Sequence, residues 1–125
     1  MKAALVIDDH WTIRRAGARM LKHFGFEVHE ARDGETGLAL DGATPLDLVL
    51  VDWRMPGLSG LDVVEAIRAT DHHQATRLIM VTAVDDVIAV AAALVAGVDA
   101  YVVKPVSERA LRSRLEQLGL LMAAA

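Results

Sequence analysis

Short apolar segments alternate with longer segments of helical periodicity along the chain. The first and third apolar segments contain no alternating polar positions, which is typical of strands buried on both faces of a parallel sheet. The second segment alternates, which predicts a more exposed strand near an edge of the sheet. The predicted strands are residues 3–7, 26–30, 47–51, 77–81 and 100–103.

Each predicted strand is followed by a segment that favours a helix. The predicted helices are residues 12–22, 34–41, 61–69, 85–96 and 107–120. The apolar face of the first helix consists of Ile13, Ala16, Met20 and Leu21. Five successive strand–helix units predict an α/β fold, with a parallel sheet and helices on both of its faces. No internal repeat or linker interrupts them, so we expect residues 1–125 to form a single domain.

The composition narrows the class of protein. Hydrophobic residues make up 54% of the chain, which argues against intrinsic disorder. The net charge of −4 argues against a non-specific nucleic-acid binder, and the lack of cysteine excludes disulfides and thiol chemistry. The first apolar run is too short for a signal peptide, and no run approaches the roughly 18 apolar residues of a membrane helix. We therefore expect a cytoplasmic protein with no membrane association.

Polar side chains follow four of the five predicted strands. Asp8 and Asp9 follow the first strand, Asp52 the third, Thr82 the fourth and Lys104 the fifth. Because the carboxyl ends of parallel strands share one edge, these side chains should converge where open α/β sheets bind ligands. One such residue alone is more often a helix cap or a loop residue, but five of these types together indicate a site.

The residue types at this edge indicate a divalent cation beside a phosphoryl group. Carboxylates that lie close together repel one another unless a cation lies among them. Carboxylate ligands completed by water suit Mg²⁺, whereas zinc favours His or Cys ligands. A lysine and a threonine hydroxyl opposite the carboxylates can bind phosphoryl oxygens, and an aspartate can itself become phosphorylated.

In these residues and their order, the chain resembles the receiver domains of bacterial two-component response regulators, of the CheY-like type. The matching segments are Val6 to Asp9, Arg14-Arg15, Val51 to Pro56, Gly60-Leu61, Met80 to Ala83 and Ala96 to Pro105. They span the chain, and their order and spacing are specific to this family. The resemblance implies a flavodoxin-like or CheY-like doubly wound (βα)5 fold, with a parallel five-stranded sheet of strand order 2-1-3-4-5.

The resemblance also implies a role for each site residue. Asp52 matches the phosphoacceptor, which a histidine kinase or a histidine phosphotransfer protein would phosphorylate. The matches to the ligands of a Mg²⁺ ion are Asp8, Asp9, Asp52 and the backbone carbonyl of Arg54.

Three further residues match the phosphoryl-binding and switch positions of the family. Lys104 matches the lysine that pairs with phosphoryl oxygens, Thr82 the hydroxyl that moves toward them, and Tyr101 the aromatic that follows Thr82. The bond between Lys104 and Pro105 matches a peptide bond that is cis in many receivers. An effector protein would then read the face formed by residues 85–96, 100–103 and 107–120.

Two positions depart from the pattern common in chemotaxis regulators. Arg54 and Val84 lie two residues after Asp52 and Thr82, where family members tune how fast water removes the phosphoryl group. A long Arg beside an apolar Val is expected to shield the acyl phosphate from water. We therefore predict slow self-dephosphorylation, and no enzymatic turnover beyond this hydrolysis and self-phosphorylation.

The sequence leaves the pathway open. A chemotaxis-type effector is the first interpretation, and a phosphorelay intermediate, a phosphate sink, or a cell-cycle or stress regulator is the alternative. No DNA-binding domain is expected after the last helix, so the output would be a protein contact or a phosphotransfer. The oligomeric state we expect is a monomer, or a weak dimer that depends on phosphorylation.

Other classes of protein fit these residues less well. A haloacid-dehalogenase-like phosphatase also forms an aspartyl phosphate, but it needs a second acid where this chain has Arg54. A flavin- or nucleotide-binding module would want a Gly-, Ser- or Thr-rich loop where this chain has Asp8-Asp9-His10. A docking module that is never phosphorylated has no need of the intact set of acids, threonine and lysine.

Overall fold

The computed structural model describes residues 1–70, 75–83 and 86–123. Its strands are β1 (Ala3–Ile7), β2 (Glu27–Ala31), β3 (Leu48–Asp52), β4 (Arg77–Thr82) and β5 (Ala100–Val103). Its helices are α1 (Trp11–His23), α2 (Gly34–Ala43), α3 (Gly60–Arg68), α4 (Val87–Ala96) and α5 (Glu108–Gln117). None of the helices in these described ranges is long and apolar enough to span a membrane.

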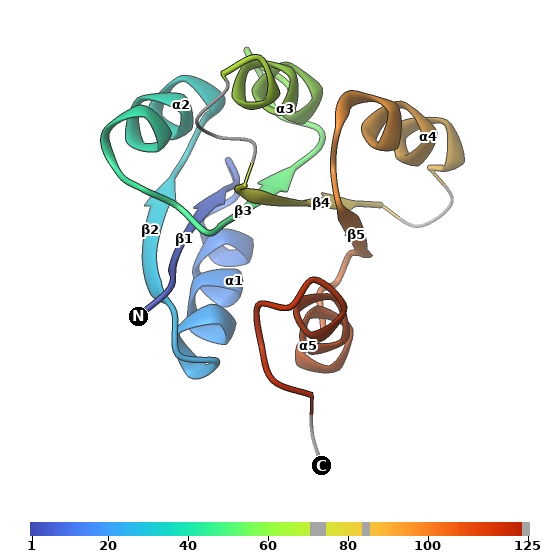
Figure 1. Cartoon of the computed structure of the whole chain (residues 1–125). Helices are drawn as coiled ribbons and strands as arrows, with labels where there is room; N and C mark the ends of the chain where they lie inside the picture. Colours follow the sequence, from blue (N-terminus) through green and yellow to red (C-terminus); the bar gives the residue numbers. More distant parts are fainter. Residues whose placement is uncertain (71–74, 84–85, 124–125) are drawn as a thin grey trace.

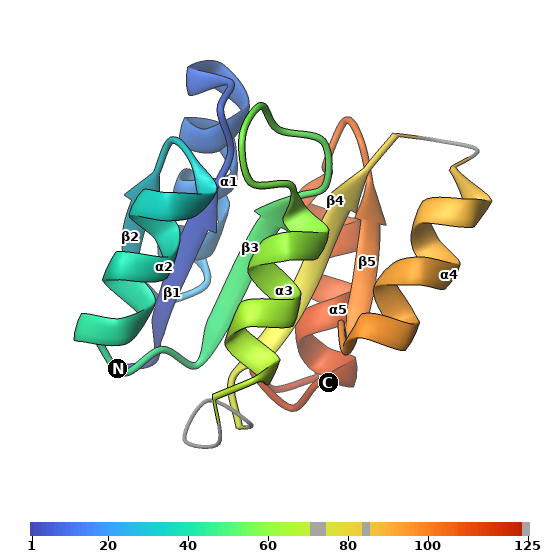
Figure 2. The same cartoon turned by 90° about the horizontal axis from the view of Figure 1, so that it is seen from above.

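The strands form one parallel sheet in the order β2-β1-β3-β4-β5, which confirms the predicted fold class. The second strand lies at an edge, as its alternating pattern predicted. Helices α2, α3 and α4 cover one face of the sheet, and α1 and α5 cover the other (Figure 1). All strands point to the same edge (Figure 2), so residues that follow different strands meet there.

Successive side chains along each buried strand point to opposite faces of the sheet, so they form two hydrophobic cores, one on each face. Leu5 and Ile7 of β1 face α2, α3 and α4, together with Val49 and Val51 of β3. The intervening side chains, which include Ala4, Val6, Leu48 and Leu50, pack against Leu21 of α1 and against Leu111 and Leu115 of α5. Burial on both faces explains why β1 and β3 have no polar alternation.

Most elements begin or end a few residues from their predicted boundaries, and local caps and turns explain three of these differences. Strand β2 begins at Glu27, since the N–H of Phe26 bonds to the carbonyl of Leu21 and closes the turn after α1. Helix α4 begins at Val87, because the Asp86 side chain caps it, and the predicted start at Asp85 lies outside the described residues. Helix α5 ends at Gln117, near Gly119 with its positive φ of 73°.

Helix α1 packs through a face that overlaps the predicted one only in part: Leu21 is in the core and Met20 packs against it. Only Leu21 of the predicted set is fully buried, and Ile13 is 38% exposed. The helix contacts the sheet through Gly17, Ala18 and Leu21, and Gly17 lies over Leu50 of β3 and Val6 of β1. The other predicted residues line a cavity of about 170 Å³ beside α1; they are Ile13, Ala16 and Met20.

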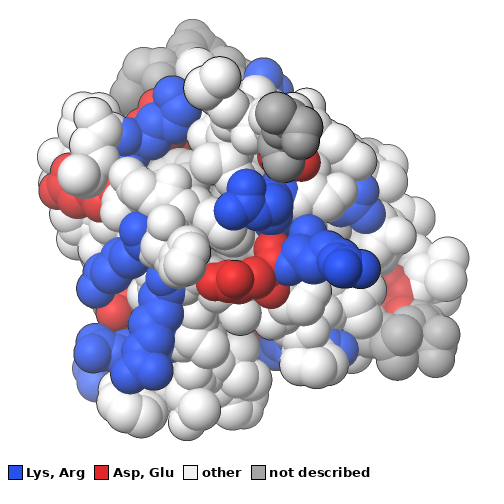
Figure 3. Space-filling view, turned by 90° about the horizontal axis from the view of Figure 1, so that it is seen from below, with Lys and Arg blue, Asp and Glu red and all other residues white. Residues whose placement is uncertain are grey.

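The surface charge is unevenly distributed. Figure 3 shows the face covered by α1 and α5, where Lys and Arg side chains cover more of the surface than Asp and Glu do. The exposed basic residues of these two helices are Arg15, Arg19, Lys22, Arg109 and Arg112. A chain with a net charge of −4 therefore still presents a basic face.

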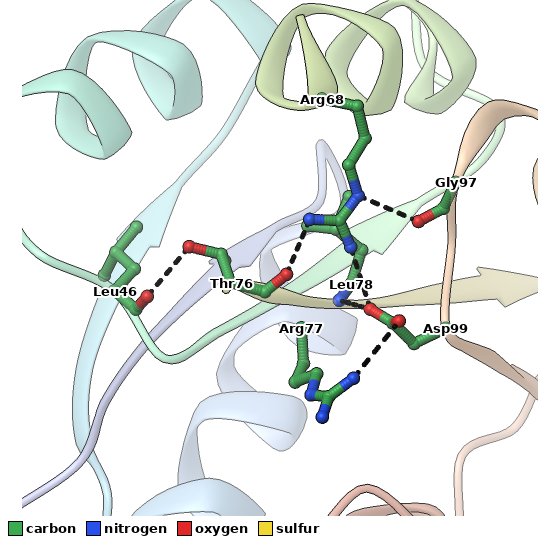
Figure 4. A network of polar contacts seen from close by, with 7 residues as sticks. All are labelled: Leu46, Arg68, Thr76, Arg77, Leu78, Gly97 and Asp99. Carbon is green, nitrogen blue, oxygen red and sulfur yellow. Dashed lines mark hydrogen bonds and ion pairs between the residues drawn. The ribbon is translucent and has the colours of Figure 1, made fainter. Parts of the chain in front are cut away.

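A polar network joins the end of α3 to the start of β4 and to the segment after α4 (Figure 4). The guanidinium of Arg68 donates to the carbonyls of Gly97 and Thr76, at 3.0 and 2.8 Å. It also bonds to the Asp99 carboxylate at 2.8 Å, and that carboxylate accepts the N–H of Leu78 at 2.8 Å. The network lies at the amino edge of the sheet, opposite the polar strand ends.

Replacing Arg68 with methionine is expected to lower the free energy of unfolding by about 3 kcal/mol or more, because at least three charge-assisted hydrogen bonds are lost. Urea denaturation measures the change. Arg77→Met is the matched control, since Arg77 is 47% exposed and its nitrogen lies 3.6 Å from Asp99. An equal loss in the two variants would contradict the structural role given to Arg68.

Candidate functional site

Three acidic side chains meet at the carboxyl edge, where β1 and β3 end side by side. The pairing of Ile7 with Val51 places the residues after β1 next to the end of β3. One ligand atom from each of Asp8, Asp9, His10 and Asp52 lies within 4.8 Å of the others. The predicted carboxylates are therefore brought together, and the structure places His10 beside them.

The two inner carboxylates are almost completely buried. Asp8 is 3% exposed and Asp52 is 2% exposed. Burial raises the pKa of Asp52 above its usual range; the hydrogen bond from Lys104 opposes this rise, and the charges of Asp8 and Asp9 add to it. A buried carboxylate with two like-charged neighbours stays ionised more easily when positive charge lies nearby.

Lys104 supplies part of that charge from the end of β5. Its Nζ lies 2.8 Å from Oδ1 of Asp52. Thr82, the last residue of β4, lies on the strand between them and is 3% exposed. The backbone N–H of Lys104 donates to the carbonyl of Thr82 at 2.8 Å, and the peptide bond between Lys104 and Pro105 is cis.

The donor set fits a hard divalent cation. Oδ2 of Asp52 is buried and accepts no hydrogen bond from any described residue. The same holds for Oδ1 of Asp9, although Nδ1 of His10 lies 3.4 Å from it without hydrogen-bond geometry. Buried carboxylate oxygens without donors are suited to Mg²⁺, which prefers oxygen ligands.

The turn after β1 is held by contacts that leave the carboxylates in place. Oδ1 of Asp8 accepts the N–H of His10 at 2.8 Å, and the carbonyl of Asp8 accepts Nη1 of Arg14 at 3.0 Å. Nε of Arg14 also bonds to Glu30 at the end of β2, at 3.2 Å. The Arg14-Arg15 segment of the family pattern thus fixes the backbone beside the site.

Arg54 lies in the turn directly after β3, as expected for a residue whose carbonyl could face the site. Its side chain points to α4, where Nη2 lies 2.7 Å from Oδ2 of Asp86. This hydrogen bond holds the pKa of Asp86 below its usual range, with help from the N–H of Ala89. Val84, the other residue expected to shield the acyl phosphate, lies outside the described residues.

Tyr101 lies on β5, close to Thr82. The two residues line one cavity of about 260 Å³ beside α4, together with Val87 and Val90. The guanidinium of Arg114 lies 5.5 Å from the ring centroid of Tyr101 and donates to its carbonyl at 3.0 Å. The predicted switch residues are therefore next to one another and next to α4.

Comparisons with known proteins agree with this architecture. The family described as the response regulator receiver domain matches residues 4–116. The chemotaxis protein CheY of Pseudomonas aeruginosa is 36% identical over 115 residues, which cover 91% of this chain and 93% of that protein. The chemotaxis protein CheY1 of Helicobacter pylori (strain J99) is 38% identical over 114 residues, or 90% and 92% of the two chains.

A solved structure shows the same fold. The chemotaxis protein CheY4 of Vibrio cholerae superposes with a TM-score of 0.88 at 27% identity, and the alignment covers 94% of this chain and 98% of that one. The doubly wound sheet and its acidic edge are thus those of a phosphoacceptor switch class. This chain belongs to the response regulator receiver domain family.

Proposed function

We propose that this chain is a chemotaxis-type response regulator in which Asp52 accepts a phosphoryl group. The observation that carries the proposal is the position of Asp52: its Oδ1 lies 2.8 Å from Nζ of Lys104, and its other oxygen is buried without a donor among the described residues. The relatives named chemotaxis proteins support the pathway.

In the proposed reaction, an oxygen of the Asp52 carboxylate attacks the phosphorus of a phosphohistidine. A bond from that oxygen to phosphorus forms, and the bond from phosphorus to the imidazole nitrogen breaks. The electron pair stays on that nitrogen, which a proton from solvent then neutralises. Lys104 balances the charge of the phosphoryl oxygens, and the Thr82 hydroxyl donates to them.

The acidic residues would hold a Mg²⁺ ion. The ligands we propose are Asp8, Asp9, Asp52 and the carbonyl of Arg54. When bound, Mg²⁺ supplies positive charge that stabilises the phosphoryl oxygens in the transition state. The burial of Asp8 and Asp52 excludes water from two of these carboxylates and strengthens their interaction with a cation.

The signal would leave through α4, β5 and α5. Phosphorylation replaces the single negative charge of the Asp52 carboxylate with the nearly two charges of an acyl phosphate at the end of β3, and Thr82 moves toward them. Because Tyr101 and Thr82 share a cavity with α4, this movement changes the population of states of that face. The helix offers large exposed apolar side chains to a protein effector; they are Val87, Ile88, Leu94 and Val95.

The phosphodonor is a histidine kinase or a histidine phosphotransfer protein, and the effector is a protein. A phosphorelay intermediate, a phosphate sink, or a cell-cycle or stress regulator is the alternative pathway. Turnover as a haloacid-dehalogenase-like phosphatase lacks support, because Arg54 is not an acid and its side chain pairs with Asp86. Slow self-dephosphorylation and a monomer, or a weak dimer that depends on phosphorylation, remain predictions.

Incubation with acetyl phosphate and Mg²⁺ tests the proposal. We expect one phosphoryl group per chain, sensitive to hydroxylamine as an acyl phosphate and mapped to Asp52 by peptide mass spectrometry. Failure to incorporate phosphate with Mg²⁺ present would refute the phosphoacceptor assignment. A pull-down from cells with and without the phosphoryl mimic beryllofluoride then separates the pathways by the identity of the retained protein.

Replacing Lys104 with methionine is expected to have opposite effects on two steps. Mg²⁺ should bind more tightly, because a positive charge 2.8 Å from Asp52 is removed. Phosphorylation should slow by roughly tenfold. Removing a hydrogen-bond donor that is fully shielded from water would slow it more, but the Lys104 side chain is 27% exposed. The fluorescence of Trp53 and phosphoryl incorporation measure the two effects. Lys22→Met, at an exposed position on α1, is the control, and slower phosphorylation without tighter Mg²⁺ binding would contradict the expectation.

A further inference from the structure

An ion pair joins the turn that follows the phosphoacceptor to the start of α4. Nη2 of Arg54 lies 2.7 Å from Oδ2 of Asp86. The other oxygen of Asp86 accepts the N–H of Ala89 at 3.2 Å and so caps the helix. One carboxylate therefore holds both the first turn of α4 and the side chain of Arg54.

Among the described residues, few other contacts hold the first turn of α4. The helix carries no polar side chain from Val87 to Ala96, and Val87 and Ile88 are 75% and 85% exposed. Ala89 is the buried side chain of this turn. The opposite end is fixed more firmly, since Nε of Arg68 donates to the carbonyl of Gly97 at 3.0 Å.

Phosphorylation would bring a competing partner close to Arg54. Arg54 follows Asp52 by two residues, and its side chain is 76% exposed, so packing does not confine the guanidinium. A phosphoryl group carries nearly two negative charges and binds a guanidinium through two parallel hydrogen bonds. It is thus a stronger partner for Arg54 than the single charge of the Asp86 carboxylate.

We propose that Asp86 is a positioning residue that holds Arg54 away from Asp52, and that phosphorylation transfers the Arg54 guanidinium from Asp86 to the phosphoryl oxygens. The transfer releases the first turn of α4. It is a route from the site to α4 separate from the one through Thr82 and Tyr101. This inference rests on the proposed function of Asp52 as phosphoacceptor.

The transfer also changes a surface that a partner can contact. Arg54 and Asp86 both line a groove between the turn after β3, α3 and α4, with an apolar wall formed by Leu61, Ile88 and Ala92. While the ion pair is closed, it places two charged groups across this groove. When Arg54 turns to the phosphoryl group, the groove loses that bridge, and the apolar side chains of α4 gain freedom to move.

The test uses beryllofluoride with Mg²⁺ as the probe and Trp53 fluorescence as the titration signal. Four proteins form a double-mutant cycle: wild type, Asp86→Asn, Arg54→Met and the double variant. Asparagine caps helices as well as aspartate does, so Asp86→Asn weakens the ion pair and keeps the helix cap. Urea denaturation checks that each variant is folded.

The cycle has a defined expected result. Asp86→Asn should bind the probe roughly two- to fivefold more tightly, because Arg54 no longer has to leave a charged partner. Arg54→Met should bind it more weakly, and adding Asp86→Asn to Arg54→Met should change nothing further. An unchanged affinity in Asp86→Asn, or additive effects in the double variant, would overturn the proposal.

Hydrogen exchange distinguishes the proposed role of Asp86 from a merely structural one. If Asp86 only capped the helix, the probe would not change the exchange rates of the amides at the start of α4. In the wild type, the probe should speed the exchange of the amides of Ala89 and Val90, which bond to the side chain and carbonyl of Asp86. In Arg54→Met these amides should already exchange faster without the probe. Wild-type protection of both amides in Arg54→Met would overturn the proposal.

A further comparison separates this inference from the proposed function. If Asp52→Asn responds to the probe as the wild type does, the phosphoacceptor assignment fails, and the transfer fails with it. If the response depends on Asp52 but Asp86→Asn behaves as the wild type, only the transfer of Arg54 fails. Arg54→Lys, which keeps the charge without the paired donors, should bind the probe with an affinity between those of the wild type and Arg54→Met.

Discussion

Replacing Asp52 with asparagine is expected to abolish phosphoryl incorporation from acetyl phosphate and to leave the fold intact. Asparagine has the size of aspartate and fits the site, where the side chain is 2% exposed. Its amide oxygen can still accept the hydrogen bond from Lys104, but the neutral amide cannot act as the nucleophile. Intact-protein mass spectrometry measures the incorporation. Phosphoryl transfer to Asp8 or Asp9 in this variant, at the wild-type rate, would refute the assignment.

The same variant should lose much of its response to Mg²⁺. A cation that binds only the folded wild type stabilises it by about 2.7 kcal/mol when the concentration of the cation is a hundred times its dissociation constant. Asp52→Asn should gain less, because one of the three clustered carboxylates is gone. Thermal unfolding with and without Mg²⁺ measures the difference. Glu65→Gln, an exposed acid on α3, is the matched control and should respond as the wild type does.

Gly60→Ala is expected to cost about 3 kcal/mol of unfolding free energy, because the site leaves no room for a side chain there. A Cβ at Gly60 would lie 2.7 Å from the carbonyl oxygen of Asp52 and 2.8 Å from Cα of Trp53. Both contacts are with the backbone, so relief requires a shift of the strand end that carries the phosphoacceptor.

A second glycine provides the control for Gly60→Ala. Gly42 lies in α2, and a Cβ there would meet nothing within 4 Å. Gly42→Ala is therefore expected to stabilise the protein by about 0.5–1 kcal/mol, as alanine does in helices. Urea denaturation of both variants measures the contrast. A similar change in the two would show that the packing of Gly60 on Asp52 does not constrain the fold.

The sequence predicted the α/β class and all ten elements because burial on both faces leaves a strong pattern in β1 and β3. The convergence of Asp8, Asp9 and Asp52 followed from the same logic, since parallel strands end at one edge. The strand order came from the family resemblance, and the structure confirms it.

Contacts between side chains that are far apart in the sequence leave no signal in the pattern of hydrophobic and polar residues. The Arg54–Asp86 ion pair joins residues that are 32 positions apart, and each residue alone looks like an ordinary loop or cap residue. Arg68 and Asp99 are 31 positions apart and equally inconspicuous. The packing face of α1 was predicted only in part: Leu21 is in the core and Met20 packs against it, but Ile13 is 38% exposed. Hydrophobicity favours Ile13, whereas Gly17 and Ala18, which have little or no side chain to count, are buried against the sheet.

The network around Arg68 sets the geometry of any motion of α4. Because the helix is held to α3 and β4 at its carboxyl end, we expect any tilt of the helix to pivot about Gly97. Ten residues of helix are about 15 Å long, so a tilt of about 10° displaces the far end by roughly 2–3 Å. A small tilt of α4 would therefore displace its amino end, next to the acidic site, the most. Its carboxyl end at Gly97 would stay almost stationary.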